Sequence, residues 1–384
     1  MSLPLEGVRV ADFSRVLAGP YCSMLLADLG AEVIKLEHPS GDETRGWGPP
    51  YAGTESAYYL SINRNKRSVV LDLKQKADLE KAYAIVRKSN VLLHNFRQGD
   101  DKKLGFDLET VKKINPTLVY AHISGYGSTG PDASKPGYDL LAQALTGFMS
   151  ITGQPDGAPT KVGVAVVDVL TGLNAALGIV ASLYAQKVQG ERVREVETSL
   201  LEAGLSGLVN VASNYLITGQ TPQRYANAHA SIVPYQSFET ADKPVAVAAA
   251  NERQFAAFAK ALGRTDWLSD ERFNSNGKRV ENRATFVPLL QTILLEKPRA
   301  QWLDLLETAG VPCAPVNSVA EVLETEQVQA RQMVQRCPHP TIPDLSLVAS
   351  GLKLDGQATP LYRHPPLLGE HTEEVLEELE TEDG

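Results

Sequence analysis

The chain has 384 residues, of which 43% are hydrophobic and 22% charged, and these proportions exclude a disordered or fibrous protein. Its formal net charge of −9 argues against a broad basic face for nucleic acid, so an anionic ligand must meet a local cluster of Lys and Arg. The cysteines, Cys22, Cys313 and Cys337, lie far apart without metal-ligand spacing, and their odd number suggests a reducing compartment.

The N-terminal sequence lacks the basic segment and apolar core of a secretory signal. No uninterrupted apolar run reaches the length that a bilayer requires. We therefore expect a cytoplasmic protein with neither a membrane nor a nucleic acid as partner.

The first half of the chain alternates strand and helix signals. Short apolar runs predict strands at 8–13, 32–37, 68–73, 90–95 and 118–124, with helices at 21–29 and 76–88. This rhythm predicts an α/β fold with a mostly parallel sheet and helices on both faces. Ligands of such sheets bind outside the carboxyl ends of the strands, so the informative loops are 14–20, 38–47, 95–103 and 125–138.

The second half reads differently. Long helices are predicted at 169–186 and 199–218, and a polar linker follows at 219–230. Strands at 232–238 and 245–249, with helices at 252–262, 281–295 and 299–309, indicate a smaller α+β unit in which Pro288 kinks or splits one helix. The chain ends in an acidic helix at 370–380, which we interpret as a solvated helix.

Several common catalytic motifs can be set aside. The segment Gly125-Tyr-Gly-Ser-Thr-Gly130 fits G-x-G-x-x-G, but the prolines at 131 and 136 cannot open the helix that a dinucleotide site needs. We interpret these glycines as a turn with positive φ, or as a close backbone approach to a ligand. The sequence has no G-x-S-x-G elbow and no zinc-ligand spacing, so we expect no metal.

Asp168 is the best clue to chemistry. It is a single carboxylate in an apolar stretch, Lys161-Val-Gly-Val-Ala-Val-Val-Asp-Val-Leu-Thr-Gly172. Removing a carboxylate from water costs several kcal/mol unless something pairs with it, and a desolvated carboxylate is a better nucleophile. The alternative is an N-cap for the helix predicted from residue 169, which on its own is the commoner use of such an Asp.

Taken together, the motifs resemble those of the family III CoA-transferases. The matching segments follow one another along nearly the whole chain: Asp12-Phe-Ser-Arg-Val-Leu-Ala-Gly-Pro20, Leu29-Gly-Ala-Glu-Val-Ile-Lys-Leu-Glu37, Gly41-Asp-Glu-Thr-Arg45, Asn63-Arg-Asn-Lys-Arg-Ser68, Asn95-Phe96, Ser124-Gly-Tyr-Gly-Ser-Thr-Gly-Pro131, Pro136-Gly-Tyr-Asp139, Asp168 and Leu367-Leu-Gly-Glu-His-Thr372. The resemblance implies a large Rossmann-like open-sheet domain built from both termini, 1–220 and 321–384. A smaller α+β domain, 221–320, is inserted between them, and two chains form an interlocked homodimer.

The resemblance also implies an activity. Such enzymes move CoA from an acyl-CoA donor to a small carboxylic acid without a prosthetic group. Asp168 is then the nucleophile, which forms first a mixed anhydride and then an aspartyl-CoA thioester.

The family's CoA contacts can be carried over to this chain by motif position. They fall on Val16, Leu17, Ala18, Leu71, Asp72, Asn95, Phe96, Lys103, Tyr138 and Asp139. Lys135 is added as a phosphate partner, and His38 stands where some relatives carry Arg. Trp47 is interpreted either as an aromatic wall near the acyl group or as a packing residue.

The substrates are less well specified by the sequence. The segment 229–236, which includes Tyr235, resembles the branch that uses succinyl-CoA with short dicarboxylic acids. Arg45 or Arg224 could bind the distal carboxylate, or each could belong to a surface ion pair.

Two other functions stay open. The family also contains α-methylacyl-CoA racemases, whose catalytic histidine falls near 136–139, where this chain has Tyr138. A phenol with a reference pKa of about 10 is poorly suited to exchanging an α-proton at neutral pH, which favours the transferase. The other alternative is a relative that binds CoA thioesters without catalysis.

Overall fold

The computed structural model describes residues 2–190 and 195–382. The chain divides into two compact units. The large unit comprises Met1–Phe148, Lys161–Gln220 and Glu326–Gly384, and the small unit comprises Met149–Thr160 and Thr221–Thr325. The large unit therefore draws on both halves of the sequence.

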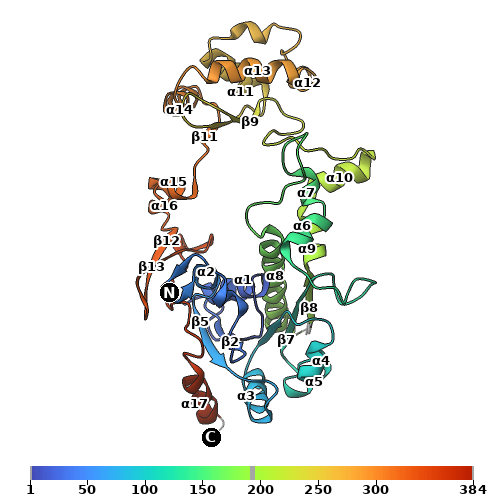
Figure 1. Cartoon of the computed structure of the whole chain (residues 1–384), viewed down its shortest axis with the longest axis vertical. Coiled ribbons are helices and arrows are strands. Elements are labelled where there is room, and N and C mark those ends of the chain that lie inside the picture. Colours follow the sequence, from blue (N-terminus) through green and yellow to red (C-terminus); the bar gives the residue numbers. More distant parts are fainter. Residues whose placement is uncertain (1, 191–194, 383–384) are drawn as a thin grey trace. The chain divides into compact units, whose positions relative to one another are not determined.

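A six-stranded parallel sheet forms the centre of the large unit (Figure 1). Its strands are β1 (Arg9–Asp12), β2 (Glu32–Glu37), β5 (Lys66–Val70), β6 (Val91–His94), β7 (Val119–Ser124) and β8 (Glu195–Ser199). Their order in the sheet is β5-β2-β1-β6-β7-β8, so the chain builds outward from β1 on one side and then from β6 on the other. This is the order of a doubly wound sheet, and the predicted α/β class is confirmed.

Helices cover both faces of this sheet. Helices α1 (Ala18–Asp28) and α8 (Val166–Gln189) pack on one face, where Val10, Cys22 and Ile179 belong to one core. Helices α3 (Lys76–Arg87), α5 (Leu108–Ile114) and α17 (Thr372–Glu382) contribute to a second core with Ala11 and Val375. Because the side chains of Val10 and Ala11, neighbours in β1, enter different cores, both faces of the sheet are covered at this strand.

The acidic C-terminal helix differs from its prediction. The side chains of Val375 and Leu379 in α17 are almost fully buried. Glu374 and Glu378 pair with Arg67 of β5 at 2.8 and 2.7 Å. The helix is therefore a packed element of the large unit and not only a solvated face.

Helix α8 has an unusual composition. By length and apolar composition this helix could cross a membrane, which the sequence did not lead us to expect. Within the structure, 39% of its most apolar window is buried. Its length and composition are weak evidence for a membrane span, because a core helix meets the same criteria. One face of α8 does pack closely: a Cβ on Gly172 would lie 2.6 Å from the Ala18 carbonyl oxygen of α1.

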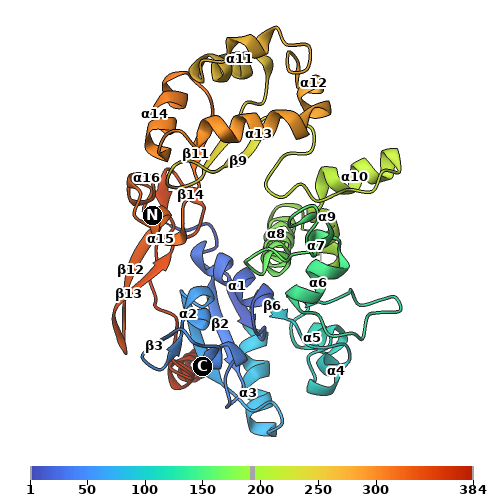
Figure 2. The same ribbon diagram turned by 45° about the horizontal axis from the view of Figure 1, so that its top comes forward.

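The small unit has its own sheet (Figure 2) and its own hydrophobic core. Antiparallel strands β9 (Tyr235–Phe238), β10 (Val245–Ala248) and β11 (Cys313–Pro315) are ordered β11-β10-β9. Its helices include α11 (Glu252–Ala261), α12 (Asn276–Glu281), α13 (Arg283–Leu294) and α14 (Arg299–Thr308). The core contains Phe255, Phe286 and Trp302, and α13 continues through Pro288 without being split.

The remaining elements are short. They are the 3-10 helices η1 (Glu43–Gly46) and η2 (Thr265–Leu268), the strands β3 (Tyr51–Ala52), β4 (Glu55–Ser56), β12 (Val334–His339), β13 (Ile342–Val348), β14 (Lys353–Leu354) and β15 (Gln357–Ala358), and the helices α2 (Ala57–Ile62), α4 (Asp100–Leu104), α6 (Asp139–Leu145), α7 (Phe148–Ile151), α9 (Leu200–Gly207), α10 (Val209–Thr218), α15 (Val319–Leu323) and α16 (Glu326–Ala330).

Candidate functional site

A pocket lies at the point in the sheet where the order of the strands reverses, between β1 and β6. Strands β1 and β6 are neighbours, and the chain leaves them toward opposite edges of the sheet, which opens a crevice beyond their carboxyl ends. The pocket there is open to solvent and holds about 150 Å³ of space accessible to an atom the size of water. Of the predicted site residues, those that line it are Val16, Leu17, Ala18, Asn95, Phe96, Lys135, Tyr138 and Asp168.

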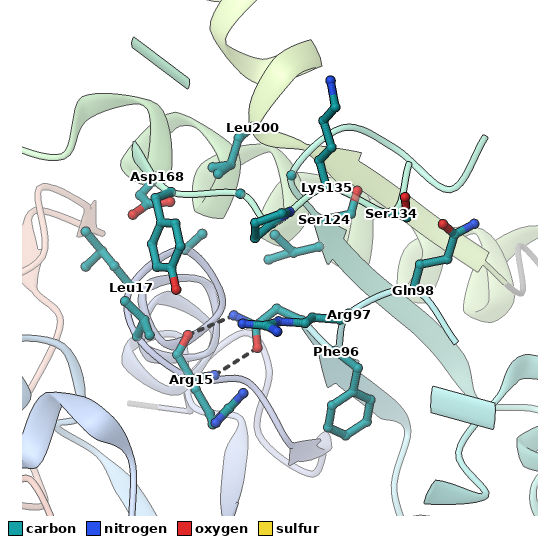
Figure 3. Close-up of a pocket in the computed structure, with 18 of the residues that line it drawn as sticks. Arg15, Leu17, Phe96, Arg97, Gln98, Ser124, Ser134, Lys135, Asp168 and Leu200 are labelled. Carbon is teal, nitrogen blue, oxygen red and sulfur yellow. Dashed lines mark hydrogen bonds between the residues drawn. The ribbon is translucent and has the colours of Figure 1, made fainter. Parts of the chain in front are cut away.

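The loops after β1 and β6 are tied together in this pocket. The Arg15 backbone N–H donates to Asn95 Oδ1 at 3.0 Å, and Asn95 Nδ2 donates to the Arg15 carbonyl oxygen at 2.8 Å (dashed in Figure 3). Asn95 therefore uses its amide to fix the neighbouring loop. This contact adds a structural role to the predicted CoA contact.

The buried ion pair of Lys35 and Asp42 also holds the loop after β1. Val16 has a φ of +70°, a strained conformation for a β-branched residue, and its N–H points at the Asp42 carboxylate at 3.3 Å. Lys35 binds Asp42 at 2.9 Å and the Ser14 carbonyl oxygen at 2.8 Å, and the pair is inaccessible to solvent. Burial alone would raise the pKa of Asp42, but Lys35 and the N–H of Thr44 lower it to about 2. The pair therefore stays charged and holds the loop.

Asp168 lies in the first turn of α8 and lines the pocket (Figure 3). The N-cap alternative is wrong, because the helix begins at Val166 and its N-cap residue is Ala165. In the described part of the chain, the Asp168 carboxylate accepts no hydrogen bond from another residue. Burial, and secondly the charge of Asp139, raise its pKa to about 7. A carboxylate without hydrogen-bond donors is suited to act as a nucleophile.

Aromatic side chains accompany Asp168. Burial, and secondly the charge of Asp168, raise the pKa of Tyr58 to about 12. The ring of Trp47 meets that of Tyr58 edge to face at 5.2 Å and is 42% exposed. Trp47 thus has a packing partner and also keeps an open surface. Tyr58 was missed by the sequence reading because an isolated Tyr in a short helix carries no motif.

Three cationic side chains line the pocket. They are Arg15, Arg97 and Lys135. Arg15 pairs with Glu43 at 3.0 Å, and Lys135 pairs with Asp132 at 2.7 Å. Among the described residues, the Arg97 guanidinium has no hydrogen-bond or ion-pair partner. Arg15 and Arg97 were missed, although both lie in the loops that the sheet rule identified.

Other predicted CoA contacts lie outside the pocket lining. His38 follows β2 on the surface, where its Nδ1 and the Ser40 hydroxyl are 2.8 Å apart. The Leu71 side chain is buried in the core, and the Asp72 carboxylate accepts a hydrogen bond from the Lys74 N–H. Lys103 is exposed and pairs with Asp100 at 2.8 Å. These residues could meet only parts of a ligand that extend beyond the pocket.

Asp139 is placed differently from its predicted role. Both of its oxygens accept hydrogen bonds from the chain itself, from Val167 N–H at 2.9 Å and from Gln143 Nε2 at 2.7 Å. Asp139 is also not among the residues that line the pocket. It faces the backbone that carries Asp168 rather than the pocket.

The arginines predicted for a substrate carboxylate are engaged elsewhere. Arg45 donates twice to Glu37, at 2.9 and 2.8 Å, and also to the Pro366 carbonyl oxygen at 3.1 Å. Arg224, in the small unit, donates to four backbone carbonyl oxygens between residues 150 and 157. Neither guanidinium is free to receive a carboxylate. Tyr235 begins β9 of the small unit, with its ring 5.3 Å from that of His229.

The glycine-rich segment after β7 shapes the pocket wall. Gly127 and Gly130 adopt the predicted positive φ, and a turn rather than a helix follows directly after Gly130. Gly125 packs against Gly137, where an added Cβ would lie 2.7 Å from the Gly137 Cα. This contact closes a loop whose end carries Lys135 into the pocket lining. In the described part of the chain, no cluster of three or more His, Cys, Asp or Glu side chains could hold a metal ion.

Comparisons with known proteins identify the family of the chain. The model of CoA-transferase family III matches residues 5–372. Succinyl-CoA:glutarate CoA-transferase of Mus musculus is 40% identical over 98% of this chain and 86% of its own length. Succinate–glutarate CoA-transferase of Agrobacterium fabrum is also 40% identical, over 98% of this chain and 96% of its own.

A solved structure supports the same relationship. The crystal structure of a CAIB/BAIF family protein from Brucella suis superposes with a TM-score of 0.89 at 36% identity, and covers 99% of this chain and 100% of that one. Sequence and fold therefore agree along almost the whole chain. The protein belongs to CoA-transferase family III.

Proposed function

We propose that this enzyme moves CoA from succinyl-CoA to a short dicarboxylic acid, with Asp168 as the nucleophile. The observation that carries the proposal is the Asp168 carboxylate, which lines the pocket at the carboxyl ends of the strands with a pKa raised to about 7. The substrate class is supported by relatives named for glutarate, and by succinyl-CoA:mesaconate CoA-transferase of Haloarcula marismortui at 36% identity.

The proposed chemistry exchanges one activated acyl bond for another. The Asp168 carboxylate attacks the thioester carbonyl, which forms a mixed anhydride and expels the CoA thiolate. The thiolate then attacks the aspartyl carbonyl, which releases the donor acid and leaves an aspartyl-CoA thioester. The acceptor acid repeats these two steps in reverse order and leaves as its CoA thioester.

Protonation of Asp168 governs the first step. With a pKa of about 7, this side chain is partly ionised near neutral pH, and only the carboxylate is nucleophilic. The attack should therefore accelerate as pH rises through about 7. Water must be excluded, because it would hydrolyse both covalent intermediates.

The cationic side chains support binding of the CoA phosphates. Arg15, Arg97 and Lys135 line the pocket that contains Asp168. Charge-assisted hydrogen bonds from such groups are among the stronger contacts to phosphate. Their position supplies the local basic cluster that an acidic chain needs for a polyanion.

An apolar surface on the large unit supports a homodimer. Leu216 and Ile217 of α10 are 81% and 82% exposed, and Leu177 of α8 and Val209 of α10 are also largely exposed. Exposed apolar side chains that are neighbours on one helix, such as Leu216 and Ile217, are typical of an interaction surface. A second copy of the chain is the partner that the family resemblance implies.

The racemase alternative is less well supported. Among the described residues, no histidine lines the pocket, and Tyr138 occupies the position expected for an acid–base group. Loss of α-proton exchange in Tyr138→Phe, with exchange present in the wild type, would instead favour the racemase. A non-catalytic CoA-binding role would not explain why a carboxylate with a pKa raised to about 7 lines the pocket at Asp168.

Mass spectrometry of the protein incubated with succinyl-CoA tests the proposal. We expect a hydroxylamine-sensitive adduct on the Asp168 peptide, and none in Asp168→Asn. Acceptor acids that discharge the adduct, from a panel that includes glutarate, mesaconate and oxalate, then identify the physiological class. Steady turnover by Asp168→Asn, or an adduct on another residue, would refute the role of Asp168.

A further inference from the structure

Helix α6 lies against the start of α8 and directs two polar side chains at it. Asp139 and Gln143 are separated by one helical turn, so they project from the same face of α6. Gln143 Nε2 donates to Asp139 Oδ2 at 2.7 Å, which joins the two side chains. The Gln143 side chain is completely buried.

Asp139 supplies the cap that α8 lacks. The N-cap residue of α8, Ala165, makes no side-chain capping hydrogen bond. Instead, Asp139 Oδ1 accepts the N–H of Val167 at 2.9 Å and that of Asp168 at 3.4 Å. A carboxylate from another helix thus satisfies backbone donors that the first turn leaves unpaired.

Gln143 fixes the chain that leads into this turn. Its Oε1 accepts the Val162 N–H at 2.8 Å, and its Nε2 donates to the Val164 carbonyl oxygen at 3.2 Å. The two side chains therefore hold the backbone at four residues between 162 and 168. The last of these residues is the proposed nucleophile.

We propose that Asp139 and Gln143 are positioning residues for the transfer reaction, which hold the first turn of α8 so that the Asp168 carboxylate meets the acyl group in the pocket. This inference rests on the proposed function, because it needs Asp168 as the nucleophile. It replaces a CoA contact at Asp139 with a contact to the backbone of the nucleophile itself.

The charge of Asp139 gives this role a measurable signature. Burial, and secondly Asp139, raise the pKa of Asp168. The other ionisable groups that face this part of the pocket are Tyr58 of α2, whose pKa Asp168 itself helps to raise, and Tyr138 before α6. Further along the lining lie the charged side chains of Arg15, Glu43, Arg97 and Lys135.

The test uses Asp139→Asn in the full-length enzyme, with single-turnover formation of the Asp168 adduct from succinyl-CoA measured against pH. The rate of adduct formation should rise with pH along an acid limb that reports the ionisation of Asp168. Loss of the negative charge of Asp139 should shift this limb to lower pH by about half a unit or more. Weakening the hydrogen bonds from Asp139 to the first turn of α8 should lower kcat about tenfold or more, because small displacements of reacting groups slow a reaction strongly. KM for succinyl-CoA should stay within about twofold.

Two further variants separate the effects. Gln143→Leu should lower kcat and leave the midpoint of the acid limb unchanged, because it removes backbone contacts but no charge. Asp107→Asn is the matched control: Asp107 caps α5 through the Thr110 N–H at 3.2 Å and should shift neither quantity. If Asp139→Asn does not fold, Asp139→Ser retains a capping oxygen and replaces it.

A rise in KM alone would identify Asp139 as a CoA ligand and overturn the proposal. An acid limb and a kcat equal to those of the wild type would overturn it as well. Failure of the proposed function is distinguishable, since the wild type itself would then form no adduct on Asp168.

Discussion

At the scale of single residues, Asp168 should lower the stability of the fold at alkaline pH. Its pKa is raised from 3.8 to about 7, so the folded state disfavours the ionised form. Below both pKa values the side chain is protonated whether the chain is folded or unfolded, and Asp168 then does not lower the free energy of unfolding. Stability is lost as pH rises between the two values, because the unfolded state then releases the proton first.

Asp168→Asn should therefore raise the melting temperature at about pH 9 and change it little at about pH 4. Thermal unfolding of both proteins, followed by circular dichroism at the two pH values, measures the difference. An equal shift at both pH values would mean that the ionised carboxylate carries no special cost.

Arg97 should contribute to CoA affinity. It lines the pocket, and among the described residues it has no ion-pair partner that a phosphate would have to displace. Arg97→Ala should raise KM for the acyl-CoA about tenfold with a small change in kcat, as expected for one charge-assisted contact. Arg87→Ala, at the exposed end of α3, is the control. A matching rise in both variants would point to a general charge effect.

These residues differ in how far their roles could be predicted from the sequence. Asp168 was a candidate because a carboxylate in an apolar stretch is unusual, but on its own an N-cap was the commoner interpretation, and only the resemblance to the family favoured a nucleophile. Arg15 and Arg97 were not, because a single Arg in a loop reads as a surface charge until the sheet order brings the two loops together. The hydrogen bonds that occupy Arg45 and Asp139 could not be predicted, because their partners are distant in the sequence or lie in another element.

At the scale of elements, the loop between β1 and α1 depends on the buried pair of Lys35 and Asp42. Asp42→Asn leaves a buried ammonium without its partner, which should destabilise the protein by about 3–5 kcal/mol. It should also lower kcat/KM about tenfold or more, since the strained Val16 loses its anchor.

Asp28→Asn provides the matched control. Asp28 ends the same helix α1 and forms a buried pair with Arg64 at 2.5 Å. It should destabilise the protein comparably and keep kcat/KM within about twofold when assayed well below its melting temperature. Equal losses of activity in both variants would mean that the Lys35–Asp42 pair acts only through global stability.

The elements themselves were predictable where the pattern was local. Strand β2 has the predicted bounds, 32–37, because its apolar run is flanked by turn residues. Strand β8 was missed, since its sequence Glu-Val-Glu-Thr-Ser is polar and suits the edge of the sheet. The helix predicted at 199–218 is broken between Gly207 and Val209, whose φ is +42°.

At the scale of the whole molecule, the apolar surface of α10 should mediate association. Leu216→Glu combined with Ile217→Glu should convert a dimer into a monomer, because charges in an apolar interface are costly to bury. Light scattering after size-exclusion chromatography measures the mass. Leu268→Glu, at an exposed apolar residue of the small unit, should leave the dimer intact. A monomeric wild type would contradict the dimer.

The architecture was predictable in class but not in connectivity. Alternating strands and helices indicate a parallel sheet, yet the placement of β6 beside β1 depends on pairing between strands about 80 residues apart. Likewise, the segment 149–160 belongs to the small unit through contacts such as those of Arg224, and nothing in its own composition predicts this.

The most direct test of the central claim follows oxygen atoms. The acceptor acid is supplied with both oxygens of its carboxylate as oxygen-18, the enzyme turns over with succinyl-CoA, and the Asp168 peptide is weighed by mass spectrometry. Transfer through an anhydride at Asp168 predicts that one acceptor oxygen remains on this side chain after each turnover, so the peptide becomes heavier. An unlabelled Asp168 peptide after many turnovers would contradict the account.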